Sequence, residues 1–192
     1  MDKKVLTSVE KVDRLIEQYI STDDKSTVTE LLNDRGDKFF SAPYSSNKEY
    51  YGAKLGGLAE YTLTVIYHLC RLNPQMNANL EMSSLIKVGL LHEFGKIGYG
   101  KEDLFLPQES QWHRDRGMMY VINDKLKGFD PKGRTMLILQ DYNIHFSEME
   151  YQAMLEYEGQ YSDSNKLTRY RENKLTLLLQ WAHIWTITQD KV

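Results

Sequence analysis

Three side chains able to do chemistry stand close together in residues 89–98, namely His92, Glu93 and Lys96. An imidazole and a carboxylate can both bind a divalent metal, and a lysine ammonium can hold a phosphate. Neighbouring residues on a helix point about 100° apart. A metal could therefore meet both His92 and Glu93 only from a position over the helix edge, and any further ligands must come from other helices.

Other candidates for a shared site lie in two predicted helices. Tyr61 and His68 are seven residues apart and therefore share a helix face. His68 stands near the far end of its helix and fits an ordinary helix histidine. His183 stands between Trp181 and Trp185 in an apolar segment, and taken alone it fits a core or partly buried histidine.

Two aromatic-rich segments could add binding surface. Residues 39–52, which include Tyr51, contain a proline, serines and a glycine, and this composition predicts a loop. Their aromatic side chains indicate that the loop packs against the protein. Residues 111–120 mix cations with aromatics and include Trp112, Arg114 and Arg116. On the local sequence alone, they fit a solvated helix face with a tryptophan anchor.

The composition limits the class of protein. The chain has 192 residues, of which 41% are hydrophobic and 27% charged, and this balance predicts one globular domain over residues 1–192. A formal net charge of −3 gives no general attraction to nucleic acid or to an anionic membrane. The apolar runs fall short of the roughly 20 residues that span a bilayer. The N-terminus lacks the apolar stretch of a signal peptide, so we expect a cytoplasmic protein with no membrane partner.

Hydrophobic periodicity and a low proline content predict an all-α fold. An apolar stripe from Val5 to Tyr19 indicates a first helix, and a capping box at residues 27–30 followed by Gly36 indicates a short second one. The remaining predicted helices cover residues 56–73, 82–93, 132–142, 147–159 and 167–189. Cys70 is the only cysteine, so the chain can form no internal disulfide and no cysteine-based zinc site.

The order of the motifs carries a resemblance that no single motif carries. Phe-Ser-Ala-Pro at residues 40–43, Gly-Gly-Leu-Ala-Glu at 56–60, the segment 90–99 and the segment 112–120 follow one another along the chain. Together they resemble the HD-domain superfamily, and more narrowly its small phage and bacterial phosphohydrolases. Residues 177–183 are similar to the helix that closes the site in that family.

The resemblance implies a single all-α, HD-domain-like helical bundle. Its core would cover residues 36–189, with residues 1–35 forming N-terminal helices. It also implies that a histidine, a His-Asp pair and a distant aspartate bind one divalent metal, which activates a water to attack a phosphate ester, usually in a nucleotide. Manganese, magnesium, iron or cobalt would suit such ligands. A phage origin fits the resemblance and would place the protein in the host cytoplasm.

The chain departs from the family pattern at most of its chemical positions. The family's first histidine falls on Tyr61, the aspartate of the His-Asp pair on Glu93, and the closing aspartate on His183. Two further histidines of the family fall on Tyr51 and Tyr157. Of these motif positions, only His92 and Lys96 stand as the family has them.

These replacements differ in their chemical cost. Glu93 adds one methylene and still offers a carboxylate, and His183 exchanges one good ligand for another. A tyrosine is a poor ligand for magnesium or manganese, because a phenol with a pKa near 10 must first lose its proton. It keeps an aromatic surface and one hydroxyl, which suit the binding of a base or a sugar.

Two hypotheses follow. The first is a pseudoenzyme that keeps the fold, has lost the metal, and binds a nucleotide-like ligand or a protein partner. Phosphate contacts would then come from Lys96, Arg114 and Arg116. Stacking and other ligand-binding surfaces would come from Tyr51, Tyr61, Trp112 and Tyr157.

The second hypothesis is an active metal-dependent phosphohydrolase with a rebuilt centre. His92, Glu93 and His183 would hold the metal, with Tyr61 nearby. Glu93 and Lys96 would then act in catalysis.

Overall fold

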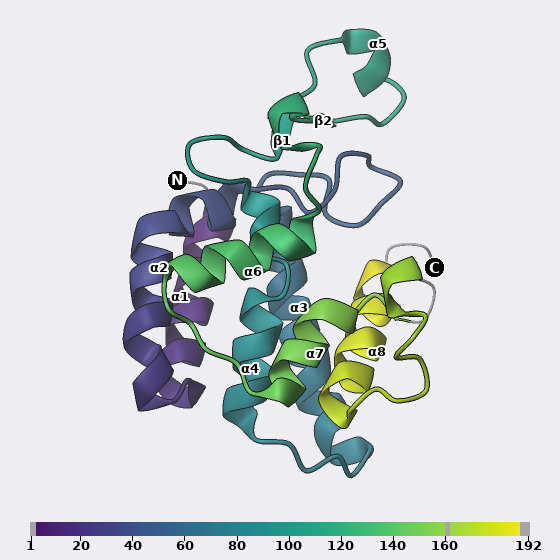
Figure 1. Cartoon of the computed structure of the whole chain (residues 1–192). Coiled ribbons are helices and arrows are strands. Elements are labelled where there is room, and N and C mark those ends of the chain that lie inside the picture. Colours follow the sequence, from purple (N-terminus) through teal and green to yellow (C-terminus); the bar gives the residue numbers. More distant parts are fainter. Residues whose placement is uncertain (1–2, 160–161, 189–192) are drawn as a thin grey trace.

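The computed structural model describes residues 3–159 and 162–188 and is mostly helical, which confirms the all-α class (Figure 1). The α-helices are α1 (Lys3–Tyr19), α2 (Thr22–Ser41), α3 (Gly57–Gln75), α4 (Met82–Leu91), α5 (Gln111–Arg114), α6 (Pro131–Asp141), α7 (Glu148–Glu156) and α8 (Lys174–Thr188). The 3₁₀ turns are η1 (Phe94–Ile97), η2 (Asp124–Leu126) and η3 (Asp163–Asn165). Two short strands, β1 (Phe105–Pro107) and β2 (Tyr120–Ile122), pair antiparallel.

Helix α3 lies at the centre of the bundle and packs against α2, α4 and α8 (Figure 1). Helix α7 covers α8 and α4, and α6 packs against η1. One cluster of buried apolar side chains extends from Val12 in α1 to Ala182 in α8. The two N-terminal helices therefore share their core with the rest of the bundle.

The second helix is longer than predicted. Ser21 accepts a hydrogen bond from the backbone N–H of Asp24, so α2 begins at Thr22, and it continues through Gly36 to Ser41. The predicted capping box at residues 27–30 and the predicted glycine cap are both wrong here. Phe39 and Phe40 are buried, and burial of this last turn outweighs the low helix propensity of one glycine. The predicted boundary between residues 1–35 and 36–189 consequently falls inside a continuous helix.

Two other helix limits differ from the prediction. Helix α3 runs through Pro74 to Gln75, because a proline in the last turn removes only one backbone donor. Helix α8 begins at Lys174 rather than at residue 167. At this start, the side chain of Asn173 accepts a hydrogen bond from the N–H of Thr176. Its predicted end at residue 189 lies outside the described residues. The predicted helix start at residue 147 is confirmed, and a capping box between Ser147 and Glu150 forms it.

A β-hairpin that was not predicted carries the segment rich in cations and aromatics. Strand β1 places Phe105 opposite Ile122, and α5 with its flanking turns closes the hairpin. Figure 1 shows α5 well away from the packed helices. In the described part of the chain, none of the helices is long and apolar enough to cross a membrane.

Candidate functional site

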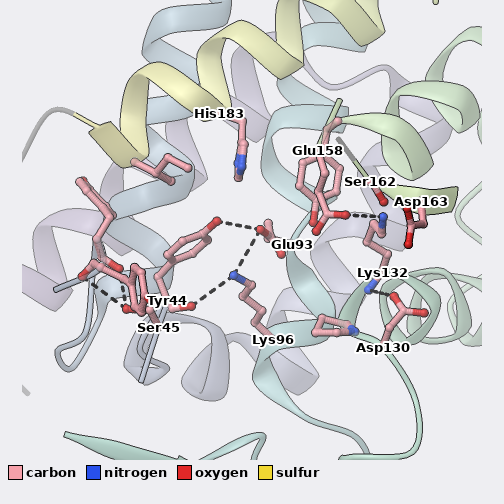
Figure 2. A pocket seen from close by; sticks show the side chains of 15 residues that line it. Tyr44, Ser45, Glu93, Lys96, Asp130, Lys132, Glu158, Ser162, Asp163 and His183 are labelled. Carbon is pink, nitrogen blue, oxygen red and sulfur yellow. Dashed lines mark hydrogen bonds and ion pairs between the residues drawn. The ribbon is translucent and has the colours of Figure 1, made fainter. Parts of the chain in front are cut away.

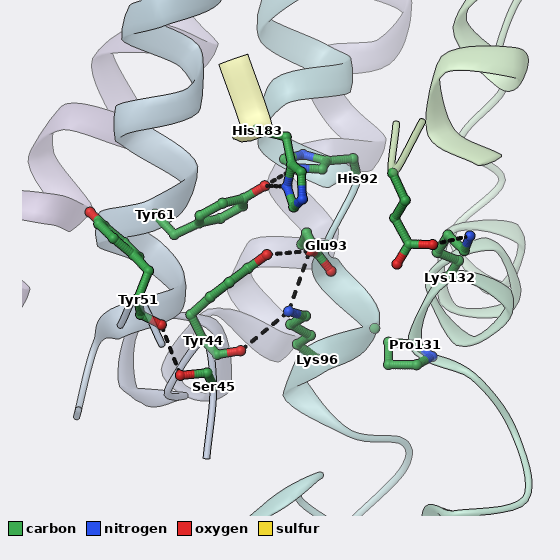
Figure 3. Close-up of polar contacts among 12 residues, drawn as sticks. Tyr44, Ser45, Tyr51, Tyr61, His92, Glu93, Lys96, Pro131, Lys132 and His183 are labelled. Carbon is green, nitrogen blue, oxygen red and sulfur yellow. Dashed lines mark hydrogen bonds and ion pairs between the residues drawn. The ribbon is translucent and has the colours of Figure 1, made fainter. Parts of the chain in front are cut away.

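The candidate site forms where α3, α4 and α8 meet. Tyr61 comes from α3, His92 directly follows α4, and His183 comes from α8 (Figure 3). Gly89 permits this meeting, because a Cβ atom at that position would lie 2.7 Å from Cγ1 of Ile66 on α3. The close approach of α4 to α3 sets His92 beside Tyr61.

The hydroxyl of Tyr61 lies between two imidazoles. Its oxygen is 3.0 Å from Nε2 of His92 and 2.6 Å from Nδ1 of His183. All three side chains are buried, with exposed fractions of 0% for Tyr61 and His92 and 9% for His183. A neutral phenol therefore joins the two histidines, and both hydrogen bonds are shielded from water.

Burial keeps these three groups uncharged near neutral pH. It lowers the pKa of His92 to about 4 and also lowers the pKa of His183. It raises the pKa of Tyr61 well above its usual value, and the nearby Glu93 carboxylate raises it further. Two neutral imidazoles and one phenol must then share their protons through a single pattern of donors and acceptors.

That pattern follows from the second nitrogen of His92. Nδ1 of His92 lies 3.0 Å from the carbonyl oxygen of Gly89 and must carry the proton, because a carbonyl can only accept. Nε2 of neutral His92 is then the acceptor for the Tyr61 hydroxyl. The Tyr61 oxygen in turn accepts from Nδ1–H of His183. This assignment leaves Nε2 of His183 as an unprotonated acceptor.

Glu93 and Lys96 form an ion pair beside this bridge. The ammonium of Lys96 lies 3.3 Å from Oε1 of Glu93, donates to the carbonyl of Tyr44 at 3.2 Å, and stands 3.4 Å from the centroid of the Tyr44 ring. The Tyr44 hydroxyl donates to the same carboxylate oxygen at 3.0 Å. Burial acts to raise the pKa of Glu93, but Lys96, the two histidines and this hydrogen bond together hold it below its usual value.

Aromatic rings surround the polar groups. The rings of Tyr44 and Tyr61 stack, with centroids 3.9 Å apart. Tyr157, which is 1% exposed, meets His92 edge to face at 4.9 Å and His183 at 5.4 Å. Tyr51 meets Tyr61 edge to face at 6.2 Å. Packed rings on several sides hold the imidazoles in one orientation.

A cavity of about 700 Å³ opens beside this cluster (Figure 2). Glu93, Lys96 and His183 line its inner end, and Tyr44, Tyr51 and Tyr157 line it as well. The opposite wall is polar and comes from the start of α6 and the segment after α7. It is made by Asp130, Pro131, Lys132, Glu158, Ser162 and Asp163.

The donor groups of the cluster do not fit a metal ion. Over residues 3–159 and 162–188, no group of three or more histidine, cysteine, aspartate or glutamate side chains is arranged to hold one. His92 and His183 both turn a nitrogen to the Tyr61 hydroxyl, and Glu93 is neutralised by Lys96. A metal would have to displace both the phenol and the ammonium.

The structure brings together most of the residues singled out in the sequence. The residues that meet at the cluster or line its cavity are Tyr51, Tyr61, His92, Glu93, Lys96, Tyr157 and His183. Trp112, Arg114 and Arg116 are placed elsewhere, on the hairpin, and do not line the cavity. The guanidinium of Arg116 stacks on the Trp112 ring at 3.5 Å, and Arg114 donates to the carbonyl of Gln108.

Several residues of the site were not singled out in the sequence. Tyr44 was one aromatic among several in a predicted loop, and no local pattern distinguished it from the others. Lys132 and Glu158 pair across the cavity wall although they are 26 residues apart, and no local pattern marks such a pair.

Comparison of the chain with models of protein families, with curated proteins and with solved structures gave no match.

Proposed function

We propose that this chain is an HD-domain-like protein whose phosphohydrolase centre is degenerate, and that it binds a nucleotide-like small molecule without hydrolysing it. The observation that carries the proposal is the Tyr61 hydroxyl held between His92 and His183. Under the resemblance, these positions would supply metal ligands. Here the two histidines are joined through the Tyr61 hydroxyl, which donates to His92 and accepts from His183.

The energetics of the cluster favour this closed state. Deprotonating Tyr61 to make it a ligand is costly, because burial raises the pKa of its hydroxyl well above 10. Freeing Glu93 for a metal would leave the largely buried Lys96 ammonium without its carboxylate partner. An unpaired buried charge costs several kcal/mol, roughly 3 to 5. Metal binding would have to offset both costs.

The cavity supports a binding role. Its volume of about 700 Å³ lies within the range of small-molecule sites, roughly 300 to 1,000 Å³. Aromatic side chains form one wall and charged side chains the other. Such a cavity can accept a ring system on one side and its polar substituents on the other.

The alternative is an active phosphohydrolase in which His92, Glu93 and His183 hold a metal after the cluster rearranges. It differs from the proposal in two measurable properties, namely metal-dependent stability and release of phosphate. If the cavity face binds a protein partner instead, the chain would also lack metal-dependent stability, as the pseudoenzyme does. It would then show no response to small molecules.

The proposal is tested by incubating the protein with manganese, magnesium, iron or cobalt and a panel of nucleotides. We expect no phosphate release above that of the His92→Ala variant, and no rise in melting temperature with any of the metals. Turnover that requires a metal and disappears in His92→Ala would establish the alternative. A rise in melting temperature with a nucleotide-like compound alone would support the binding role.

A further inference from the structure

The charges that line the cavity do not suit a phosphate group. Among the described lining residues, four carboxylates stand against two ammonium groups. Both ammonium groups are already paired with cavity carboxylates, Lys96 with Glu93 and Lys132 with Glu158. Of the remaining two carboxylates, that of Asp163 pairs with Lys166, which lies outside the lining, and that of Asp130 caps α6 through backbone N–H groups. An incoming phosphate would therefore find no unpaired ammonium group among the described lining residues, which carry more carboxylates than ammonium groups.

The helix that begins at the cavity also offers no anion site. The N-terminus of α6 lies in the cavity wall, and exposed N–H groups at such a position often bind phosphate. Here Oδ1 of Asp130 accepts from the N–H groups of Lys132 and Gly133 at 2.8 and 3.0 Å. The protein's own carboxylate occupies the place that a phosphate would take.

The cavity does offer a hydrogen-bond acceptor that is held in one orientation. His183 is nine-tenths buried and its ring points from α8 into the cavity (Figure 2). Its Nδ1–H is held by the Tyr61 oxygen at 2.6 Å, which leaves the lone pair of Nε2 directed elsewhere. Within the described residues, no hydrogen bond engages Nε2. An acceptor fixed in this way calls for a donor from a ligand.

The walls next to His183 present aromatic surface. Tyr44, Tyr51 and Tyr157 all line the cavity, and Tyr157 packs directly against the His183 ring. The Tyr44 ring already stacks on Tyr61 and Tyr157 is 1% exposed, so a planar ring system would stack on Tyr51, which is only partly buried. The carboxylates on the opposite wall are strong acceptors for hydroxyl and amino groups.

We infer that the cavity binds an uncharged, ring-shaped, nucleoside-type molecule, which donates an N–H or O–H group to Nε2 of His183, and that it discriminates against the corresponding phosphate ester. The inference rests on the proposed function and narrows its ligand class. The closed metal centre and the lack of an unpaired cavity cation then agree, since a site that disfavours the phosphate ester is not suited to its hydrolysis.

The test compares matched ligands on the full chain by isothermal titration calorimetry. The pairs are adenosine, guanosine, cytidine and uridine, each against its own 5′-monophosphate. For at least one pair we expect the nucleoside to bind about tenfold or more tightly than the monophosphate, a ratio that corresponds to about one unit in log Kd. Equal or tighter binding of the monophosphates, or no binding of any of the four nucleosides, would overturn the inference.

The contact itself is tested with His183→Asn. The asparagine amide can still donate to the Tyr61 oxygen but carries no group at the Nε2 position. We expect nucleoside affinity to fall about tenfold with the unfolding transition preserved, as for loss of one buried hydrogen bond. Unchanged affinity would contradict the assignment of Nε2.

A second variant keeps the inference falsifiable if His183→Asn does not fold. Glu158→Gln removes one cavity charge on the wall opposite His183, so the preference for nucleoside over monophosphate should narrow by severalfold. An unchanged preference would contradict the electrostatic account.

Neither of these two results depends on metals, so the inference and the proposed function can fail separately. A protein that binds no nucleoside yet shows no metal-dependent turnover would leave the degenerate centre standing, whereas metal-dependent turnover would remove the proposed function itself.

Discussion

The hydroxyl oxygen of Tyr61 lies 2.6 Å from Nδ1 of His183, although the two residues are 122 positions apart in the chain. The contact joins α3 to α8 at the centre of the bundle, and the same oxygen is 3.0 Å from Nε2 of His92. One phenol therefore satisfies two buried imidazoles. This arrangement is the physical basis for the proposal that the centre is closed to metals.

Tyr61→Phe tests the energetic weight of this bridge. The substitution keeps the ring and removes the hydroxyl, which leaves a buried nitrogen without its partner on each histidine. We expect the free energy of unfolding to fall by roughly 1–3 kcal/mol, measured by urea denaturation. Tyr151→Phe removes a hydroxyl from a ring that is 47% exposed and should change stability by less than about 0.5 kcal/mol. Equal effects of the two substitutions would contradict a special role for the bridge.

The buried histidines predict a loss of stability in mild acid. Burial lowers the folded-state pKa of His92 to about 4, and that of His183 shifts in the same direction. The unfolded chain, with histidine pKa values near 6.5, then binds more protons than the folded chain between about pH 6.5 and pH 4. The stabilisation is present above the unfolded pKa and is lost as the pH falls through this window.

The His92 shift alone corresponds to about 2 kcal/mol lost between about pH 7.5 and pH 5. The pKa of Glu93 is also lowered, so its stabilisation is present above the unfolded carboxylate pKa and is lost as the pH falls from there through the lowered folded pKa, which lies mainly below the range compared here. Urea denaturation at the two pH values measures the difference. His92→Gln, checked for a cooperative transition at the higher pH, should show a smaller dependence. A flat profile down to about pH 5 would contradict the neutral, buried state of His92.

Glu93→Gln tests the ion pair next to the bridge. Glu93 and Lys96 have side-chain exposures of 4% and 16%, so removing the carboxylate charge leaves a largely buried ammonium without an anionic partner. We expect a loss of roughly 3 kcal/mol in the free energy of unfolding. Lys54→Met breaks a more exposed pair with Glu60 and should cost less than about 1 kcal/mol. Comparable losses for both would show that the Glu93–Lys96 pair behaves as a surface contact.

Restoring the family's residues at three positions tests whether the centre is a degenerate metal site. The triple variant Tyr61→His, Glu93→Asp, His183→Asp removes the phenol bridge and supplies the ligand types that the resemblance implies. We expect this variant to bind about one manganese or cobalt ion per chain, detected by calorimetry, whereas the unmodified chain binds none. Failure of a folded triple variant to bind either metal would argue against descent from such a site.

The sequence predicted the parts of the fold that depend on local patterns. The stripe that includes Val12 and Ile16 gave α1, and the reciprocal cap at Ser147 and Glu150 gave the start of α7. The start of α2 was missed because the capping residue is Ser21, whose side chain accepts from the N–H of Asp24, and not a residue of the capping box at 27–30. The hairpin of β1 and β2 was missed because three-residue strands carry too short an alternation to detect.

The sequence predicted which residues form the candidate site, but it did not predict the hydrogen bonds among them. Aligned motif positions placed Tyr61, His92 and His183 in one region, and the structure brings them into contact. The direct hydrogen bonds among them depend on how closely α3, α4 and α8 approach, which no residue pattern specifies. Trp112 was grouped with the site through motif order alone, and the structure places it in α5, none of whose residues is buried.

Anomalous diffraction from crystals of the unmodified protein soaked in manganese tests the central claim most directly. The account predicts that the Tyr61 oxygen lies within hydrogen-bond distance of both His92 and His183, with no anomalous peak at the cluster. A manganese peak bonded to His92, Glu93 and His183, with the phenol displaced, would contradict it.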